Sequence, residues 1–140
     1  MNKFFSGIAM ISLLLLTLTG CETDNTALLT DGIWTFENLT TNSEDETLQG
    51  FVALGKALLT DATMEFQTSG DYIISSPLTD EPSTGTWSLI GDDQLIMDAD
   101  DELPSTGNIE TLTKKELKYM ETYVDENQDP YTISTTWVRD

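Results

Sequence analysis

The 140-residue chain has no histidine, one cysteine, and only six lysine or arginine side chains. The absence of histidine removes the commonest general base, the Ser-His and Cys-His nucleophile pairs, and the usual zinc ligand. Paired carboxylates are able to hydrolyse glycosides, but no pattern in the sequence places two of them in one cleft. We therefore expect no catalytic residue, no metal site and no cofactor, and we interpret the chain as a protein that is not an enzyme.

The shortage of basic side chains excludes a second class of function. Six basic residues stand against 25 acidic ones, which gives a formal charge of −19. Nucleic acid is excluded as a partner, because its binding depends on neutralising phosphates with lysine and arginine. Such acidity is typical of a well-solvated surface that keeps a protein monomeric, and its alternative meaning is attraction of divalent cations or of a basic partner.

The single cysteine, Cys21, stands at the end of an export-like leader. Because the chain offers it no second cysteine, no disulfide forms inside the domain, and stability comes from packing. The leader consists of Lys3, a mostly apolar run at 4–18, and Leu18-Thr19-Gly20-Cys21. A basic start, an apolar core and small residues at the cut are the parts of a signal peptide. The apolar run is shorter than the roughly 20 residues that span a bilayer.

This leader resembles the signal sequences of bacterial lipoproteins. The resemblance implies diacylglyceryl transfer to the Cys21 thiol and cleavage before Cys21, which leaves the protein attached to a membrane through its lipid chains. The predicted organisation is a signal peptide at 1–20, a lipidated tether at 21–27 and a folded domain at 28–140. We place the protein in the bacterial cell envelope and favour the outer membrane over the inner one. The sequence does not distinguish the periplasmic face of that membrane from the cell surface.

Beyond the tether, short apolar runs separated by turn residues predict β-strands. Thr68-Ser69-Gly70-Asp71 and Gly91-Asp92-Asp93 are tight-hairpin signals, because glycine adopts a positive φ at low cost. Such strands form either a closed up-and-down barrel or a two-sheet sandwich, and we predict the barrel, because closure removes both exposed edges. Eight strands are expected, at 33–39, 63–67, 72–75, 84–90, 94–99, 108–112, 117–124 and 131–139.

One helix interrupts the strands, at 43–61. Ser43 and Glu46 have the spacing of a capping box, and the acidic residues between them suit the positive end of a helix dipole. We interpret the helix as packed on the barrel, and the alternative is a mobile lid over an opening. Its apolar face recurs at helical spacing and comprises Leu48, Phe51, Val52, Gly55, Leu58 and Leu59.

Three features resemble the lipocalin family, and in particular the small lipocalin-like domains of bacterial lipoproteins. Gly32-Ile33-Trp34 begins the first predicted strand, as the Gly-x-Trp of lipocalins does. Leu28-Leu29 stand where lipocalins place a short turn that closes the barrel base, and Arg139 ends the last strand, where the family has an arginine packed over that tryptophan. The resemblance implies barrel closure by Gly32, Trp34 and Arg139, with a cation-π contact of about 0.5 to 2 kcal/mol.

The likeness spans residues 28–139 and includes the segments 66–72, 85–89 and 109–117. The chain departs from the family in lacking a domain disulfide, in placing its helix after the first strand instead of the eighth, and in having Asp129-Pro130-Tyr131 where a Thr-Asp-Tyr turn is usual. A helix after the first strand is typical of the fatty-acid-binding branch of the superfamily. The resemblance implies an all-β fold, an eight-stranded antiparallel up-and-down β-barrel with one α-helix between the first and second strands, preceded by a lipoprotein signal peptide.

Alternation along the strands predicts which side chains face the barrel interior. Apolar walls with a few polar tips are typical of small-molecule sites, and the alternative is that these side chains simply fill the interior. The candidate ligand-binding residues of the lumen are Phe66, Tyr72, Trp87, Met97, Tyr119, Glu121, Tyr123, Tyr131, Ile133 and Trp137.

Glu121 distinguishes two phases of the seventh strand. If the tyrosines at 119 and 123 face inward, Glu121 lies between them. A buried carboxylate at that place costs free energy unless it is hydrogen-bonded or takes part in the function of the protein. If Met120 and Val124 face inward instead, Glu121 is a surface charge.

Two acidic stretches remain. The segment 125–129 has the alternating oxygen ligands that begin an EF-hand loop, but Pro130 stands where glycine is needed and Thr136 where glutamate is needed. We interpret both stretches as solvated turns, with weak calcium binding as the alternative. The second stretch comprises Asp98, Asp100, Asp101 and Glu102 and matches no such template.

The sequence thus predicts a monomeric, membrane-anchored lipocalin-like lipoprotein that binds or carries a small hydrophobic ligand in the cell envelope. The alternative is a filled-barrel structural or protein-interaction module of the envelope that has no small-molecule ligand. In that case its outer surface would contact an envelope protein partner.

Overall fold

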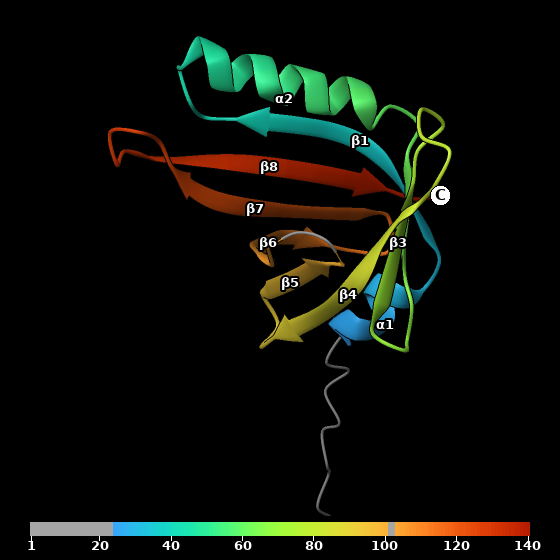
Figure 1. The fold of residues 1–140 in the computed structure, drawn as a ribbon. Helices are drawn as coiled ribbons and strands as arrows, with labels where there is room; N and C mark the ends of the chain where they lie inside the picture. Colours follow the sequence, from blue (N-terminus) through green and yellow to red (C-terminus); the bar gives the residue numbers. More distant parts are fainter. Residues whose placement is uncertain (1–23, 101–102) are drawn as a thin grey trace, which may run out of the picture.

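The computed structural model describes residues 24–100 and 103–140, in which eight antiparallel strands pair in sequence order and β8 returns to β1. The predicted closed up-and-down barrel with a helix between its first two strands is therefore confirmed, and the two-sheet sandwich is excluded (Figure 1). The signal peptide predicted at 1–20 and the lipidation site Cys21 lie outside the described residues. The strands are β1 (Ile33–Thr41), β2 (Thr63–Phe66), β3 (Asp71–Ser75), β4 (Ser83–Ile90), β5 (Gln94–Ala99), β6 (Ser105–Leu112), β7 (Glu116–Val124) and β8 (Pro130–Val138).

The two hairpin glycines take the conformation that their turns require. Gly70 between β2 and β3 has a φ of 95°, and Gly91 between β4 and β5 has a φ of 61°. A side chain at either position would strain the backbone, whereas glycine adopts a positive φ without that cost. Both turns lie at the same end of the barrel, because β2 and β4 run in the same direction. We call this end the base and the opposite end the mouth.

A short helix, α1 (Asn25–Thr30), closes the base. Asp24 caps the helix by accepting a hydrogen bond from the backbone N–H of Thr26, and the Asn25 side chain donates to the carbonyl of Asp92 in the β4–β5 turn at 2.7 Å. Leu29 is fully buried, and its carbonyl accepts a hydrogen bond from the Trp34 indole at 3.0 Å. The last three residues of the predicted tether, at 25–27, therefore belong to this helix, because the Asp24 cap starts it before Leu28.

The second helix, α2 (Glu46–Leu58), begins later than its sequence pattern predicts. The N-cap is Asp45, whose carboxylate accepts the backbone N–H of Leu48 at 2.9 Å. The predicted cap, Ser43, instead accepts the backbone N–H of Asp45 at 3.2 Å and so stabilises the turn before the helix. The prediction of a helix over 43–61 was too long at both ends. It was wrong at the start because a carboxylate two residues further on supplies the same capping chemistry, and the helix ends at Leu58 with Leu59 as its C-cap.

Helix α2 lies along a part of β1 that has a strand on only one side. β1 pairs with β2 from Ile33 to Thr35, whereas its pairing with β8 continues to Thr41. Figure 1 shows α2 running beside the later part of β1, which is the part nearer the mouth. A Cβ atom on Gly55 would lie 3.1 Å from Leu39 Cδ2, so glycine allows the helix to approach the strand closely. Within the described residues, neither helix has the length and hydropathy needed to cross a bilayer.

The base and the middle of the barrel hold the hydrophobic core. Its fully buried members include Trp34, Phe66, Met64, Leu95 and Trp137, which come from strands on all sides of the barrel. Burial of this kind contributes roughly 25 cal/mol for each Å² of apolar surface removed from water. Residues 24–140 thus supply a closed sheet, a plug at one end and a packed core, and we treat them as a self-contained folding unit.

Candidate functional site

The predicted lumen residues separate into two groups along the barrel axis. Tyr72, Met97 and Tyr119 are at most 9% exposed, and Phe66 and Trp137 are 1% exposed. These five side chains fill the interior. Another predicted lumen residue, Trp87, is half-buried beside the β2–β3 turn at the base, where its indole N–H donates to the Gln67 carbonyl and its ring meets Phe66 edge to face.

Two glycines make room for the tyrosines of this interior layer. A Cβ atom on Gly85 would collide with the Tyr72 ring and with the Asp98 carbonyl, and one on Gly107 would lie 2.7 Å from Tyr119 Cδ2. The tyrosine rings therefore occupy the space where neighbouring strands carry no side chain. They form the floor beneath the mouth.

Above this floor, the four remaining predicted lumen residues lie at the mouth. Glu121, Ile133 and Tyr131 are half-buried, and Tyr123 is 39% exposed. The rings of Tyr123 and Tyr131 stack with their centroids 5.7 Å apart and an interplanar angle of 25°. Along β7, the burial of Leu117 and Tyr119 selects the inward phase that includes Glu121, so this carboxylate shares a face with the tyrosines.

Burial and a nearby carboxylate raise the pKa of two tyrosines, one in the floor and one at the mouth. Burial, followed by the Glu121 carboxylate, raises the pKa of Tyr119 to about 12. Burial also raises the pKa of Tyr123 to about 12, again with Glu121 as the next contribution. A nearby negative charge disfavours a second one, so each phenol holds its proton more tightly. A phenol is already neutral at physiological pH, and these two hydroxyls therefore stay neutral hydrogen-bonding groups at still higher pH.

A groove of about 380 Å³ opens at the mouth between the start of α2 and the β7–β8 hairpin. Its apolar surface comes from Leu48 and Phe51 on the helix and from Val124 and Tyr131 on the hairpin. We call it the mouth groove. Its other lining residues are polar or acidic, namely Asp45, Thr47, Asp125, Glu126 and Asn127.

The basic side chains of the described ranges lie away from the mouth groove. Lys114, Lys115 and Arg139 are at the base, where Arg139 bonds to the Lys114 carbonyl. Lys118 pairs with Glu110 at 3.0 Å on the outside of β6 and β7, and Lys56 lies in the last turn of α2. The mouth groove is therefore lined by carboxylates and by no lysine or arginine.

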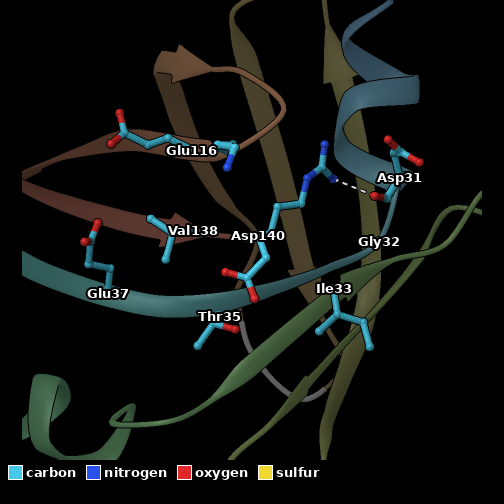
Figure 2. Close-up of a pocket in the computed structure, with 10 residues that line it drawn as sticks. Asp31, Gly32, Ile33, Thr35, Glu37, Glu116, Val138 and Asp140 are labelled. Carbon is cyan, nitrogen blue, oxygen red and sulfur yellow. Dashed lines mark hydrogen bonds between the residues drawn. The ribbon is translucent and has the colours of Figure 1, made fainter.

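A larger hollow, about 850 Å³, lies on the outside of the barrel at the base. Figure 2 shows it among Ile33, Thr35, Glu116 and Val138, with a hydrogen bond reaching the Asp31 carbonyl. This bond comes from Arg139, at 2.9 Å.

The interactions of Arg139 make this hollow part of the barrel closure. Its Cζ atom lies 4.1 Å from the centroid of the Trp34 ring, which is the packing that the lipocalin resemblance implied. Gly32, the third closure residue, has a φ of 123° and connects α1 to β1. We therefore interpret this hollow as part of the structural closure of the base.

The predicted acidic stretches have structural partners. The Asp125 carboxylate accepts backbone N–H groups of Asn127 and Asp129 at 2.8 and 2.9 Å and so organises the hairpin loop. Asp100 accepts a hydrogen bond from the Thr84 hydroxyl at 2.7 Å, and Asp101 and Glu102 lie outside the described residues. Across the part of the chain that the structure describes, no three histidine, cysteine or carboxylate side chains gather in a way that suits a metal ion.

Of the apolar residues of the groove, the sequence pattern identified Tyr131 and missed the other three. Leu48 and Phe51 were assigned to one packing face of the helix, and Val124 appeared only in the alternative phase of its strand. A signal was present in the sequence of α2, because Leu54 is an apolar residue outside the predicted face. In the structure Phe51, Leu54 and Leu58 are 65%, 56% and 50% exposed, so the predicted packing face was wrong at Phe51 and Leu58. The recurrence of apolar residues at 51, 54 and 58 is the sequence pattern that indicates a second apolar stripe.

Residues 30–119 match the lipocalin-like domain family. This match covers more than half of the chain, and the protein therefore belongs to that family. Lipocalins are eight-stranded barrels whose interior is wide enough for side chains or for one small ligand, and they typically act as binding proteins.

Two solved structures are similar to this chain at low sequence identity. A DUF4847 family protein from Bacteroides vulgatus shares 13% identity with a TM-score of 0.46, and the alignment covers 76% of this chain and 93% of that one. A deswapped triple mutant of bovine odorant-binding protein shares 14% identity with a TM-score of 0.49, covering 78% of this chain and 72% of that one. No curated protein matches the chain at a significant level.

Proposed function

We propose that the protein binds a small hydrophobic ligand in the mouth groove and acts as a carrier or sensor in the bacterial cell envelope, without catalysing a reaction. The observation that carries this proposal is the groove itself, a space of about 380 Å³ in which an apolar surface from the helix and the hairpin lies beside polar and acidic residues. Ligand sites in proteins occupy roughly 300 to 1,000 Å³ and combine apolar walls with a few polar groups. Membership of the lipocalin-like domain family supports the same function.

The position of the ligand differs from that in a hollow barrel. Because Tyr72 and Tyr119 fill the middle of the lumen, the ligand lies above them, against Tyr131 and the start of α2. Helix α2 then serves as a wall of the site. The filled interior below contributes stability, and the mouth contributes binding.

Binding of a neutral naphthyl fluorophore by residues 22–140 tests this function. We expect saturable one-to-one binding with an increase in probe fluorescence, because the groove removes the rings from water. The Tyr131→Ala variant should bind about tenfold more weakly, which corresponds to about 1.4 kcal/mol, since Tyr131 lines the groove. Ile90→Ala is the matched control, because Ile90 is 54% exposed at the base and its truncation should leave the dissociation constant unchanged.

Absence of saturable binding by the folded parent would reject the carrier function. The result would support the alternative of a filled barrel that acts through an envelope protein partner. Equal affinities of the parent and the Tyr131→Ala variant would show that the probe occupies a different place.

We also propose that the protein is a lipoprotein held at the membrane by Cys21, and that the outer membrane is its location. The support is the leader sequence, which ends in Leu18-Thr19-Gly20-Cys21 after an apolar run. Two or three acyl chains would hold the domain stably, since each buried methylene contributes about 0.8 kcal/mol. Cells that express the full chain should incorporate radiolabelled palmitate into it, and the Cys21→Ser variant should incorporate none. An unlabelled parent chain would rule out the anchor.

A further inference from the structure

The walls and the rim of the mouth groove have different chemistry. Leu48, Phe51, Val124 and Tyr131 form an apolar surface, while Asp45, Asp125 and Glu126 supply three carboxylates around it. An apolar wall favours the body of a hydrophobic molecule, and the carboxylates favour positive charge.

Aromatic and acidic groups behind the groove add to this preference. Tyr131 stacks on Tyr123, and Glu121 lies on the same inward face of β7 as Tyr123. The faces of tyrosine rings attract cations through the ring quadrupole. The lysines and the arginine of the described ranges stand at the base, on the outer wall or at the far end of α2, so none of them lines the groove to neutralise its carboxylates.

We propose that the ligand of the mouth groove is a small hydrophobic organic cation, such as an amine with an aromatic or aliphatic body. This inference rests on the proposed binding function and specifies the class of ligand. The apolar body packs against Phe51, Val124 and Tyr131, and the positive charge lies toward the carboxylates of Asp45, Asp125 and Glu126.

The size and charge of the groove argue against other occupants. A space of about 380 Å³ fits one small molecule, whereas a stable protein interface buries about 800 Å² on each partner. A second copy of this chain would bring its own carboxylates to the rim, because its formal charge is −19. Like charges brought together in this way oppose association.

Three probes with one naphthyl ring system separate charge from hydrophobicity. They are 2-naphthylmethylamine, 2-naphthylmethanol and 2-naphthoate, which at pH 7 are positive, neutral and negative. We expect residues 22–140 to bind the amine about tenfold more tightly than the alcohol at about 10 mM salt, and to bind the naphthoate more weakly than the alcohol. The advantage of the amine should shrink at about 100 mM salt, because the Debye length falls from roughly 30 Å to roughly 10 Å.

A triple variant that removes the rim charge tests where the preference arises. Asp45→Asn keeps a good helix N-cap, Asp125→Asn keeps a side-chain oxygen for the hairpin loop, and Glu126→Gln changes an exposed side chain. In this variant most of the advantage of the amine over the alcohol should disappear, and any advantage that remains is the contribution of Glu121 and the tyrosine rings.

A second triple variant removes the same number of charges away from the groove. Glu65→Gln, Asp92→Asn and Asp93→Asn change exposed residues on the outside of β2 and in the β4–β5 turn at the base. This control should keep the preference for the amine. An equal loss of preference in both triple variants would overturn the proposal, because it would assign the effect to net charge.

The remaining outcomes separate this inference from the proposed function. Equal binding of amine and alcohol by the parent protein would overturn the cation preference and leave the carrier function intact. Binding of none of the three probes would reject both. Binding of a lysine-rich amphipathic peptide in the absence of amine binding would also overturn the proposal, in favour of a basic protein partner.

Discussion

Replacing Trp34 with alanine is expected to lower the free energy of unfolding by about 3 to 5 kcal/mol, the range for removing a large aromatic side chain from a core. Trp34 is fully buried, donates to the Leu29 carbonyl and carries the Arg139 guanidinium over its ring. Its removal therefore leaves a cavity and detaches both α1 and the C-terminal arginine from the base. Urea unfolding followed by far-UV circular dichroism measures the change.

The neighbouring residue on the same strand provides the control. Ile33 points outward and is 56% exposed, so Ile33→Ala should change stability by no more than about 0.5 kcal/mol. Similar losses in the two variants would contradict the closure of the base by Trp34 and would attribute the effect to strand propensity.

Adding a single methyl group at Gly107 is expected to destabilise the barrel by about 1 to 3 kcal/mol, as overpacking of a filled core does. The new Cβ of Gly107→Ala would lie 2.7 Å from Tyr119 Cδ2, and its three nearest neighbours are all Tyr119 atoms. The Tyr119 ring, which is 8% exposed, would have to move out of the interior layer. The urea midpoint reports the loss.

A double-mutant cycle tests the cause of this cost. In a Tyr119→Ala background the clash is absent, so Gly107→Ala should cost much less than it does in the parent, and the two changes should be strongly non-additive. Thr106→Ala, at an exposed position beside Gly107, is the control for strand effects. Additive losses would show that the cost of Gly107→Ala does not arise from contact between the new methyl group and the Tyr119 ring.

The strands were predictable because their signals are local. Alternation and turn residues located all eight strands, and the range 94–99 agrees with Gln94–Ala99 of β5. The hairpin at Gly70 was predictable for the same reason, since one residue with a positive φ determines the turn. The helix start was not, because Ser43 and Asp45 both offer capping oxygens and only the path of the chain selects between them.

The site was predictable only in part. Period-two alternation identified the inward faces, so Tyr123 and Tyr131 were found together on adjacent strands. Depth along the barrel axis has no such local signal. Whether an inward residue fills the core, as Trp137 does, or lies at the mouth, as Tyr131 does, depends on barrel shear and on the position of α2.

With an anchor at Cys21, the position of helix α1 would give the domain a defined orientation on a membrane. It begins at Asn25 beside the base, and the three Cα–Cα steps from Cys21 to Asp24 reach at most about 10 Å. A chain attached through Cys21 would therefore rest its plugged end, with Lys114, Lys115 and Arg139, against the lipid head groups. Its occupant would then enter and leave from the aqueous compartment instead of from the bilayer.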